Sequence, residues 1–301
     1  MSDGLRFDGR VAIVTGAGGG LGRTHALALA ARGCKVVVND LGGSVDGSGA
    51  SGAAQAVVDE ITAAGGEALA DRASVTDPEA VAAMIAKAMD AWGRVDILIN
   101  NAGILRDKTF GKITPDLFDA VFDVHLRGSW TCAQAVWEIM RGQGYGRIVF
   151  TTSSSGLYGN FGQANYGAAK SAVVGLMNTL HIEGAKYGIR VNCLSPTART
   201  RMTEELLPPE AAALLTPESV SPGAVFLASE AAPSKVILGA GAGVFSVVRI
   251  EETPGIAFGQ YVTADDLAAH WDALQGQSGA EPLEAAWAQT QKFVELASGK
   301  D

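Results

Sequence analysis

Short apolar runs alternate with longer alanine-rich stretches along most of the chain. Most of these runs are continuously apolar, which is typical of strands that are covered on both faces. Seven runs are predicted strands: Val11–Thr15, Lys35–Asn39, Glu67–Ala70, Val95–Ile99, Arg147–Thr152, Arg190–Leu194 and Val236–Leu238. The stretches between them predict six helices, at about 21–32, 50–64, 77–91, 115–141, 164–187 and 217–229. The alternation predicts an α/β fold with a doubly wound, Rossmann-type parallel sheet.

The pattern changes after Gly243. One more strand is a candidate at Val244–Ile250, and two helices are expected at about 264–275 and 282–298. In the second of these, side chains that recur at three- and four-residue steps form one helical face: Leu283, Trp287, Thr290, Val294 and Ala297. We therefore expect a dinucleotide-binding catalytic domain at 1–245. A C-terminal helical extension at 246–301 is expected to pack on that domain or on a partner subunit.

Charge and composition exclude several classes of protein. The net charge is −9, and no Lys/Arg cluster supplies the basic face that a nucleic-acid binder needs. No apolar run reaches the roughly 18 residues of a membrane-spanning helix. The three cysteines are odd in number and far apart, which favours reduced, buried thiols. We find neither a secretory signal nor a peroxisomal Ser-Lys-Leu ending, and we expect a cytoplasmic protein.

A glycine-rich loop follows the first predicted strand and precedes the first predicted helix. It has the spacing Thr-Gly-x-x-x-Gly-x-Gly, with glycines at Gly16, Gly20 and Gly22. Residues without a Cβ allow a pyrophosphate to approach the backbone, and the helix start offers N–H groups and a positive dipole end to it. Helix caps and tight turns also use glycine, but this position favours a dinucleotide loop.

The second predicted strand ends at Asp40, eighteen residues after Gly22. A carboxylate at this position accepts hydrogen bonds from the two ribose hydroxyls of an adenosine and repels a 2′-phosphate. Leu41 and Gly42 follow, so no basic residue is placed to bind that phosphate. The pattern favours NAD over NADP; a solvent-exposed acid at a strand end is the alternative.

Tyr166 and Lys170 lie four residues apart in a predicted helix and therefore share one face. An ammonium group beside a phenol favours the phenolate. Tyrosine titrates near pH 10, so a base at neutral pH needs a depression of about three units, roughly 4 kcal/mol. The lysine and the positive ring of an oxidised nicotinamide are the expected sources. Ser153, at the end of the fifth strand, would donate a hydrogen bond to the same substrate oxygen.

These residues resemble the short-chain dehydrogenase/reductase family over about residues 7–245. The resemblance rests on Asn100-Asn101-Ala102-Gly103, Ser153 and Tyr166-Gly167-Ala168-Ala169-Lys170. The family spacing of thirteen residues to Tyr166 selects Ser153 over its neighbours Ser154 and Ser155. The chain looks most like the (3R)-hydroxyacyl-CoA dehydrogenase part of the peroxisomal multifunctional enzymes of type 2. The supporting stretches are 5–10, 38–43, 102–107, 124–129 and 158–166, and that subfamily also has a C-terminal extension.

The resemblance implies further cofactor contacts. Leu21 would line the pyrophosphate with the three loop glycines, and Ser74 and Val75 would lie near the adenine. The residues Asn101, Ala102 and Gly103 would stiffen the central sheet beside the cofactor. Thr200 is a candidate ligand for a phosphate or the carboxamide, and Tyr166 and Lys170 would also contact the cofactor.

The chain departs from the family pattern at three places. The acid that many relatives carry near the adenine is missing from Ala73-Ser74-Val75, and the usual Pro-Gly after the sixth strand is Pro196-Thr197. The asparagine of the family's proton relay is replaced by His125. In relatives that residue acts through its backbone carbonyl, which a histidine retains, so direct titration of the imidazole is the minor alternative. The other histidines have no ligand partners at metal spacing, so no metal is expected.

The resemblance implies an NAD-dependent dehydrogenase of (3R)-hydroxyacyl-CoA thioesters, acting as a homodimer or tetramer. A substrate loop is expected at Thr197–Leu215, where Arg199 and Arg201 are candidate ligands for the coenzyme A phosphates. Another secondary alcohol, such as a hydroxysteroid, is the enzymatic alternative. A cofactor-binding sensor or scaffold is the non-enzymatic alternative, and an intact Ser153, Tyr166 and Lys170 speak against it.

Overall fold

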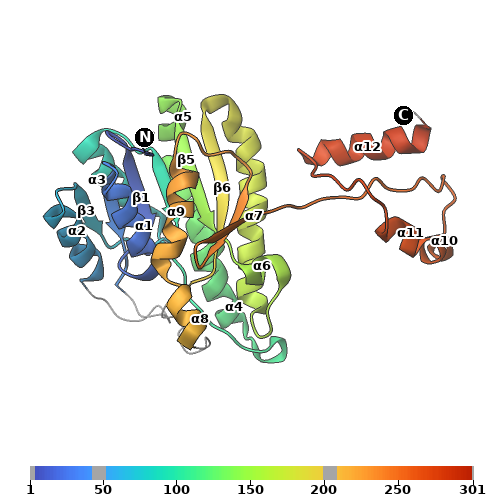
Figure 1. Cartoon of the computed structure of the whole chain (residues 1–301), viewed down its shortest axis with the longest axis horizontal. Helices are drawn as coiled ribbons and strands as arrows, with labels where there is room; N and C mark the ends of the chain where they lie inside the picture. The colour runs from blue at the N-terminus through green and yellow to red at the C-terminus, as the bar shows by residue number, and fades with distance from the viewer. Residues whose placement is uncertain (1–3, 43–51, 199–208, 300–301) are drawn as a thin grey trace. The chain divides into compact units, whose positions relative to one another are not determined.

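Parallel strands of nearly continuous apolar sequence form the centre of the protein, as predicted. The computed structural model describes residues 4–42, 52–198 and 209–299 (Figure 1). In this part of the chain, one sheet has eight strands in the order β3-β2-β1-β4-β5-β6-β7-β8. The strands are β1 (Val11–Thr15), β2 (Lys35–Asn39), β3 (Ala68–Asp71), β4 (Ile97–Asn100), β5 (Gly146–Thr151), β6 (Ile189–Pro196), β7 (Ile237–Gly241) and β8 (Val244–Val248).

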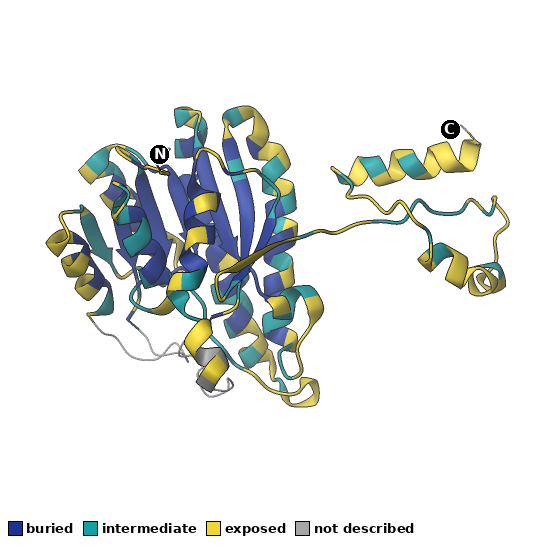
Figure 2. Ribbon diagram, in the orientation of Figure 1, coloured by how far each residue is buried: buried dark blue, intermediate teal, exposed yellow. Residues whose placement is uncertain are grey.

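Helices cover both faces of the sheet, which confirms the doubly wound α/β fold. One face carries α1 (Gly20–Ala30), α2 (Ala53–Ala63) and α9 (Pro217–Ala228). The other carries α3 (Pro78–Trp92), α4 (Pro115–Phe122), α5 (Gly128–Gln143) and α7 (Ala164–Gly184). Figure 2 shows the resulting distribution, with buried strands at the centre and exposed residues on the outer helix faces. Strands buried from both sides explain why their sequences do not alternate.

The strand order reverses beside β1, whose residues pair with β2 on one side and with β4 on the other. Ala12 is opposite Val36 of β2 and Ile97 of β4. Ligands of open parallel sheets bind outside the carboxyl ends of the strands at such a switch point. The predicted site residues follow β1, β2, β4 and β5 directly, so the topology brings them to this edge.

The structure differs from the sequence prediction in several local elements. The single helix expected at 115–141 is interrupted by a π-helical turn, η2 (Asp123–Arg127). Three short elements were not predicted: the 3₁₀ turn η1 (Phe110–Lys112), α6 (Ser154–Tyr158) and α8 (Pro209–Leu214). The 3₁₀ turn η3 (Ala185–Tyr187) ends the helix expected at 164–187. These elements are five residues or shorter, apart from α8, and so carry little periodic signal.

The last two strands of the sheet are joined by the two-residue turn Ala242–Gly243, with φ of +51° and +75°. Such a turn joins antiparallel strands, so β8 is the exception in an otherwise parallel sheet. The eighth strand confirms the candidate at Val244–Ile250, although it ends at Val248.

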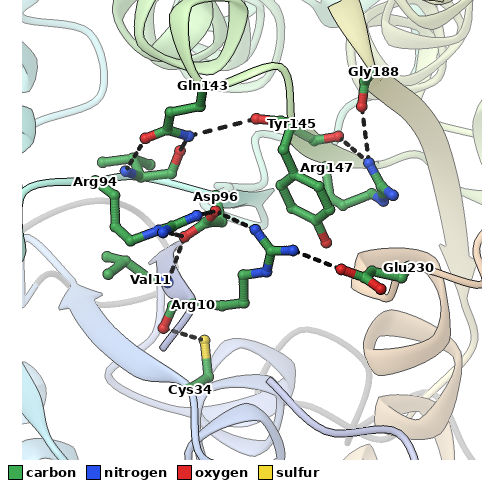
Figure 3. Close-up of polar contacts among 12 residues, drawn as sticks. Arg10, Val11, Cys34, Arg94, Asp96, Gln143, Tyr145, Arg147, Gly188 and Glu230 are labelled. Atoms are coloured by element: carbon green, nitrogen blue, oxygen red, sulfur yellow. Dashed lines mark hydrogen bonds and ion pairs between the residues drawn. The ribbon is translucent and has the colours of Figure 1, made fainter. Parts of the chain in front are cut away.

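The amino edge of the sheet, opposite the predicted site, holds a buried ion network (Figure 3). Asp96 is fully buried. Its carboxylate accepts hydrogen bonds from Arg10, from Nε and Nη2 of Arg94, and from the Val11 N–H. Tyr145 lies under the Arg10 guanidinium, with 3.7 Å between Cζ and the ring centroid. Sequence reasoning did not identify this network, because its members lie far apart along the chain.

The chain divides into two compact units, Met1–Val247 and Val248–Asp301. The second unit contains α10 (Ala264–Ala269), α11 (Trp271–Gln275) and α12 (Ala286–Ser298), none of which has a buried residue. An antiparallel bridge joins Glu252 and Glu281, and Glu252 also pairs with Lys292 at 2.8 Å. What the second unit packs against stays a prediction.

Candidate active site

The glycine loop connects β1 to α1 by a backbone path that favours glycine at two positions. Gly16 and Gly20 have φ of +62° and +51°. A Cβ on Gly22 would lie 2.2 Å from the Gly16 carbonyl oxygen. The N-cap of α1 is Gly19, which has no side chain to cap the helix. The first N–H groups of the helix therefore lack a side-chain acceptor and are available to a ligand at the loop. This cradle fits an anionic group, as predicted for a pyrophosphate.

The segment after β4 fastens the glycine loop to the sheet. The Asn101 side-chain amide donates to the carbonyl oxygens of Thr15 and Gly16, at 3.0 Å each. The Thr15 hydroxyl in turn accepts from the backbone N–H groups of Asn101 and Ala102. Sequence analysis assigned Asn101 and Ala102 a stiffening role but missed Thr15, whose only signal is its place directly before the first glycine.

Asp40 lies at the end of β2 and contacts the glycine loop directly. One carboxylate oxygen accepts from the Gly18 N–H at 2.8 Å, and the other accepts from the Gly42 N–H at 2.7 Å. A carboxylate has about four acceptor sites, so both oxygens retain capacity for ribose hydroxyls. Leu21 of the predicted pyrophosphate site packs against the hydrophobic core from the first turn of α1.

The turn after β3 lies beside Asp40 and contains Ser74 and Val75. Asn39 donates from its side chain to Asp71 at 3.1 Å and to the Ala73 carbonyl at 2.9 Å. The Ser74 hydroxyl contacts Thr76 at 2.8 Å, and Val75 is buried. Asp71 also accepts from the Ala73 N–H. An acid is therefore present near the position where the family pattern lacked one, but it serves to hold this turn.

The catalytic candidates meet at the carboxyl end of β5. The Lys170 amine is buried and donates to the Thr151 carbonyl at 2.6 Å, and it lies 5.7 Å from the Tyr166 ring centroid. Ser153 is buried, and its hydroxyl lies near enough to the phenol to favour the ionised form of Tyr166. Its oxygen accepts from the Ser155 N–H at 3.2 Å, which leaves the Ser153 hydroxyl proton available for donation. The structure thus brings together the three side chains that the sequence predicted.

Burial governs the ionisation of this group. It raises the pKa of Tyr166, an effect that the Ser153 hydrogen bond opposes and the charge of Asp107 reinforces. Burial also lowers the pKa of Lys170 to about 7. The expectation that the lysine and a bound oxidised nicotinamide together lower the pKa of the tyrosine concerns the complex and stays a prediction. In the protein by itself, removal of the phenol from water has the largest effect and raises this pKa.

The buried His125 lies in the π-helical turn η2, and its ring meets Tyr166 edge-on with 5.1 Å between centroids. Its Nε2 contacts the Ile104 backbone, 2.8 Å from the carbonyl oxygen. Burial, with a smaller contribution from the charge of Lys170, holds the pKa of His125 well below its usual value. The His125 carbonyl accepts from the Ser129 hydroxyl at 2.7 Å. A neutral imidazole agrees with the reading in which this residue acts through its backbone.

Close packing around His125 explains Gly103. A Cβ on Gly103 would lie 2.4 Å from the imidazole Cε1. Three buried polar atoms around the site have no hydrogen-bond partner among the described residues: Asn100 Nδ2, His125 Nδ1 and Thr151 Oγ1. Two further unpaired atoms of the described residues, His25 Nε2 and Arg141 Nε, lie away from the site, so these atoms do not by themselves mark it. The fit to a bound dinucleotide rests on the uncapped glycine loop and on Asp40.

Part of the predicted substrate loop lies outside the described residues. This part includes Thr200, Arg199 and Arg201, so their predicted contacts stay predictions. Among the described residues, no cluster of His, Cys, Asp or Glu is suited to hold a metal ion. Within the same residues, no helix is both long and apolar enough to cross a membrane.

Comparison with known proteins gives consistent results. A family model described as short chain dehydrogenase matches residues 10–211. Peroxisomal multifunctional enzyme type 2 of Mus musculus is 45% identical over 98% of this chain, which spans 40% of that protein. The solved structure of the full-length enzyme of that name from Drosophila melanogaster matches 98% of this chain and half of its own, with a TM-score of 0.82 and 38% identity.

A solved 7α-hydroxysteroid dehydrogenase, complexed with NADH and 7-oxo glycochenodeoxycholic acid, is also similar. It matches 81% of this chain and 97% of its own, with a TM-score of 0.73 and 32% identity. That structure holds a nicotinamide cofactor, which is the class of ligand that the glycine loop and Asp40 fit.

Proposed function

The chain belongs to the short chain dehydrogenase family, and from this premise we propose that it oxidises (3R)-hydroxyacyl-CoA thioesters with NAD, or reduces the corresponding ketones. The family establishes an oxidoreductase that acts on a small molecule with a nicotinamide cofactor. The thioester proposal is supported by similarity to the multifunctional enzyme over almost the whole chain. The single observation that carries the reaction type is the meeting of Ser153, Tyr166 and Lys170 at one edge of the sheet.

The choice of NAD over NADP is supported by Asp40. Its carboxylate is fixed at the glycine loop by the Gly18 and Gly42 N–H groups, where an added phosphate would meet a negative charge. The residues Gly16, Gly20, Leu21 and Gly22 would hold the pyrophosphate. When bound, the nicotinamide would accept the hydride from the carbinol carbon, so that alcohol and NAD⁺ become ketone, NADH and a proton.

The protein's own side chains would handle the proton. The Ser153 hydroxyl, already accepting from the Ser155 N–H, would donate to the substrate oxygen and hold it beside Tyr166. The Tyr166 oxygen would take the hydroxyl proton during oxidation and return it during reduction. Lys170 has a pKa of about 7 and lies against the Tyr166 ring, so its amine can exchange a proton near neutral pH.

The alternative substrate is a hydroxysteroid, and the likeness to the 7α-hydroxysteroid dehydrogenase supports it. A sensor or scaffold without turnover is less well supported, because the complete catalytic group is present. We also propose a homodimer or tetramer in the cytoplasm, although the multifunctional relatives are named as peroxisomal. In such an oligomer, a partner subunit would cover the apolar side chains of α12 that are exposed in the single chain.

An NADH-formation assay tests the proposal. The protein is incubated with NAD or NADP and with paired (3R)- and (3S)-hydroxyacyl-CoA substrates or a 7α-hydroxysteroid. We expect turnover of the (3R) thioester with NAD, and loss of that turnover in Tyr166→Phe. Asp40→Ala should weaken NAD binding about tenfold and reduce the preference over NADP. Turnover of the steroid alone would overturn the thioester proposal. Cofactor binding without turnover of any of these substrates would overturn the proposed dehydrogenase activity.

A further inference from the structure

A chain of hydrogen bonds outside the active centre joins the loop after β4 to the start of α7. One carboxylate oxygen of Asp107 accepts from the Gln163 side-chain amide at 2.7 Å. The Gln163 side-chain oxygen accepts from the Ser155 hydroxyl at 2.8 Å and from Asn160 at 3.0 Å. Both ends of the Gln163 amide are therefore occupied, and a charge-assisted bond anchors one of them.

The same two loops are joined through their backbones. The Lys108 N–H donates to the Gly162 carbonyl at 3.0 Å, and Lys108 and Gln163 form an isolated parallel bridge. Gln163 occupies the N-cap of α7, but its side chain does not cap the helix. A side chain in that position usually satisfies the helix N–H groups. Here it points to Asp107 instead, and only its carbonyl binds the first turn, at the Gly167 N–H.

This chain of bonds ends at the catalytic group. Ser155, which Gln163 holds, donates its N–H to the Ser153 oxygen. Tyr166 is the third residue of α7, the helix that begins after Gln163. We propose that Asp107 is a positioning residue for the reaction, which fixes Ser153 and Tyr166 through Gln163 and carries a negative charge on the loop that Gln163 joins to the start of α7.

The charge of Asp107 acts against the other groups that face Tyr166. Lys170 lies on α7, the His125 ring on η2, and Ser153 on the turn between β5 and α6; Arg106, next to Asp107, donates to the Leu105 carbonyl. Cys193 of β6 faces the amine of Lys170. Among them Asp107 contributes a negative charge that disfavours the phenolate. Since Asp107 is exposed, salt screens this effect, whereas the buried amine and phenol are screened much less.

The inference rests on the proposed function for its catalytic meaning, but it is tested without turnover. Tyrosine labelled at the phenolic carbon gives one NMR signal for each of the five tyrosines, and Tyr166→Phe identifies the signal of Tyr166. The titration midpoint of this signal is measured in the wild type, in Asp107→Asn and in Asp107→Glu, at low and at molar salt. Asparagine retains an acceptor for Gln163 and removes only the charge.

We expect Asp107→Asn to lower the midpoint by a few tenths of a pH unit at low salt, the order expected for one partly solvated charge. Asp107→Glu should restore the wild-type value, and molar salt should bring the wild type toward Asp107→Asn. An unchanged midpoint in Asp107→Asn, or a shift that salt does not reduce, would overturn the proposal. The salt titration of the wild type alone decides the charge effect if a variant does not fold.

The kinetic arm separates this inference from the proposed function. With any alcohol that the protein oxidises, the acidic limb of kcat/KM should move in Asp107→Asn in the same direction as the NMR midpoint. If no alcohol is turned over, the proposed function fails while the NMR titration still decides the role of Asp107.

Discussion

The two edges of the central sheet use buried polar groups in opposite ways. At the amino edge, Asp96 is fully buried, and both of its carboxylate oxygens accept hydrogen bonds from arginines (Figure 3). One of these oxygens also accepts from the Val11 N–H. At the carboxyl edge, Lys170 and His125 are buried with no counter-ion in contact among the residues that the structure describes, and their pKa values are lowered. Paired charges at one edge stabilise the fold, and ionisable groups with shifted pKa values at the other are available for chemistry.

The contrast predicts that substitutions at the two edges have separable effects. Loss of the Tyr166 oxygen at the carboxyl edge should lower activity with little change in the free energy of unfolding. Loss of the Asp96 charge at the amino edge should lower that free energy with little change in the activity of the folded protein. Two variants test this separation, and two more test the ionisation of the carboxyl edge.

Tyr166→Phe should have the largest effect. It removes the phenol oxygen that would exchange the substrate proton, so kcat should fall roughly 10³-fold. The cofactor dissociation constant and the Tm should change little, because the ring and its packing are retained. Steady-state kinetics, cofactor titration and thermal unfolding check the three quantities. A variant that retains more than a tenth of wild-type kcat would remove Tyr166 from the reaction.

Asp96→Asn should destabilise the protein by about 3 kcal/mol, because Arg10 and Arg94 lose a buried acidic partner. Denaturant unfolding measures this change, and kcat of the folded variant should stay within about twofold of wild type. Glu230→Gln is the matched control. It removes the other partner of Arg10, an exposed ion pair, and should cost less than about 0.5 kcal/mol. Equal losses in both variants would contradict the account of the amino edge.

Lys170→Met should change how stability depends on pH. The folded protein releases the Lys170 proton at about 7, whereas an unfolded chain holds it up to about pH 10.5. Burial of the charged amine destabilises the folded protein at pH 7 and below. The free energy of unfolding therefore rises as the pH increases above 7 and falls again as the pH returns to 7. Between pH 7 and about pH 9 the wild type should gain roughly 2 kcal/mol that the variant lacks. Parallel pH profiles of unfolding would show that the amine is not buried as described.

His125→Asn should have the smallest effect. Since burial already keeps the imidazole neutral, its replacement should leave the acidic limb of the pH–rate profile in place. Asparagine retains the backbone carbonyl that accepts from Ser129. A limb that moves by a full pH unit would instead assign the proton relay to the imidazole.

Sequence alone predicted most of the fold and most members of the site. Continuous apolar runs located all seven parallel strands, and the structure brings together Tyr166, Lys170 and Ser153, which their spacing had singled out. The interruption at η2 was not predictable, because the apolar pattern of 115–141 continues through it. The Asp96 network was missed because Arg10 reaches Asp96 only when β1 and β4 pair.

The ionisation of the site in the protein without its cofactor could not be predicted from the sequence. The four-residue spacing of Tyr166 and Lys170 correctly placed an amine beside a phenol. It carried no information on how much water either group retains, and burial determines the direction of both pKa shifts. The contribution of Asp107 also depends on a contact between two loops that lie more than fifty residues apart.

The central claim is that Tyr166 is a weak acid in the protein alone and becomes a base only when a positive charge is bound beside it. Titrating the labelled Tyr166 signal with and without saturating NAD⁺ tests this most directly. The account predicts a midpoint above that of free tyrosine in the protein alone and a clear fall with NAD⁺, but a smaller one with NADH. A midpoint that NAD⁺ leaves unchanged would contradict it.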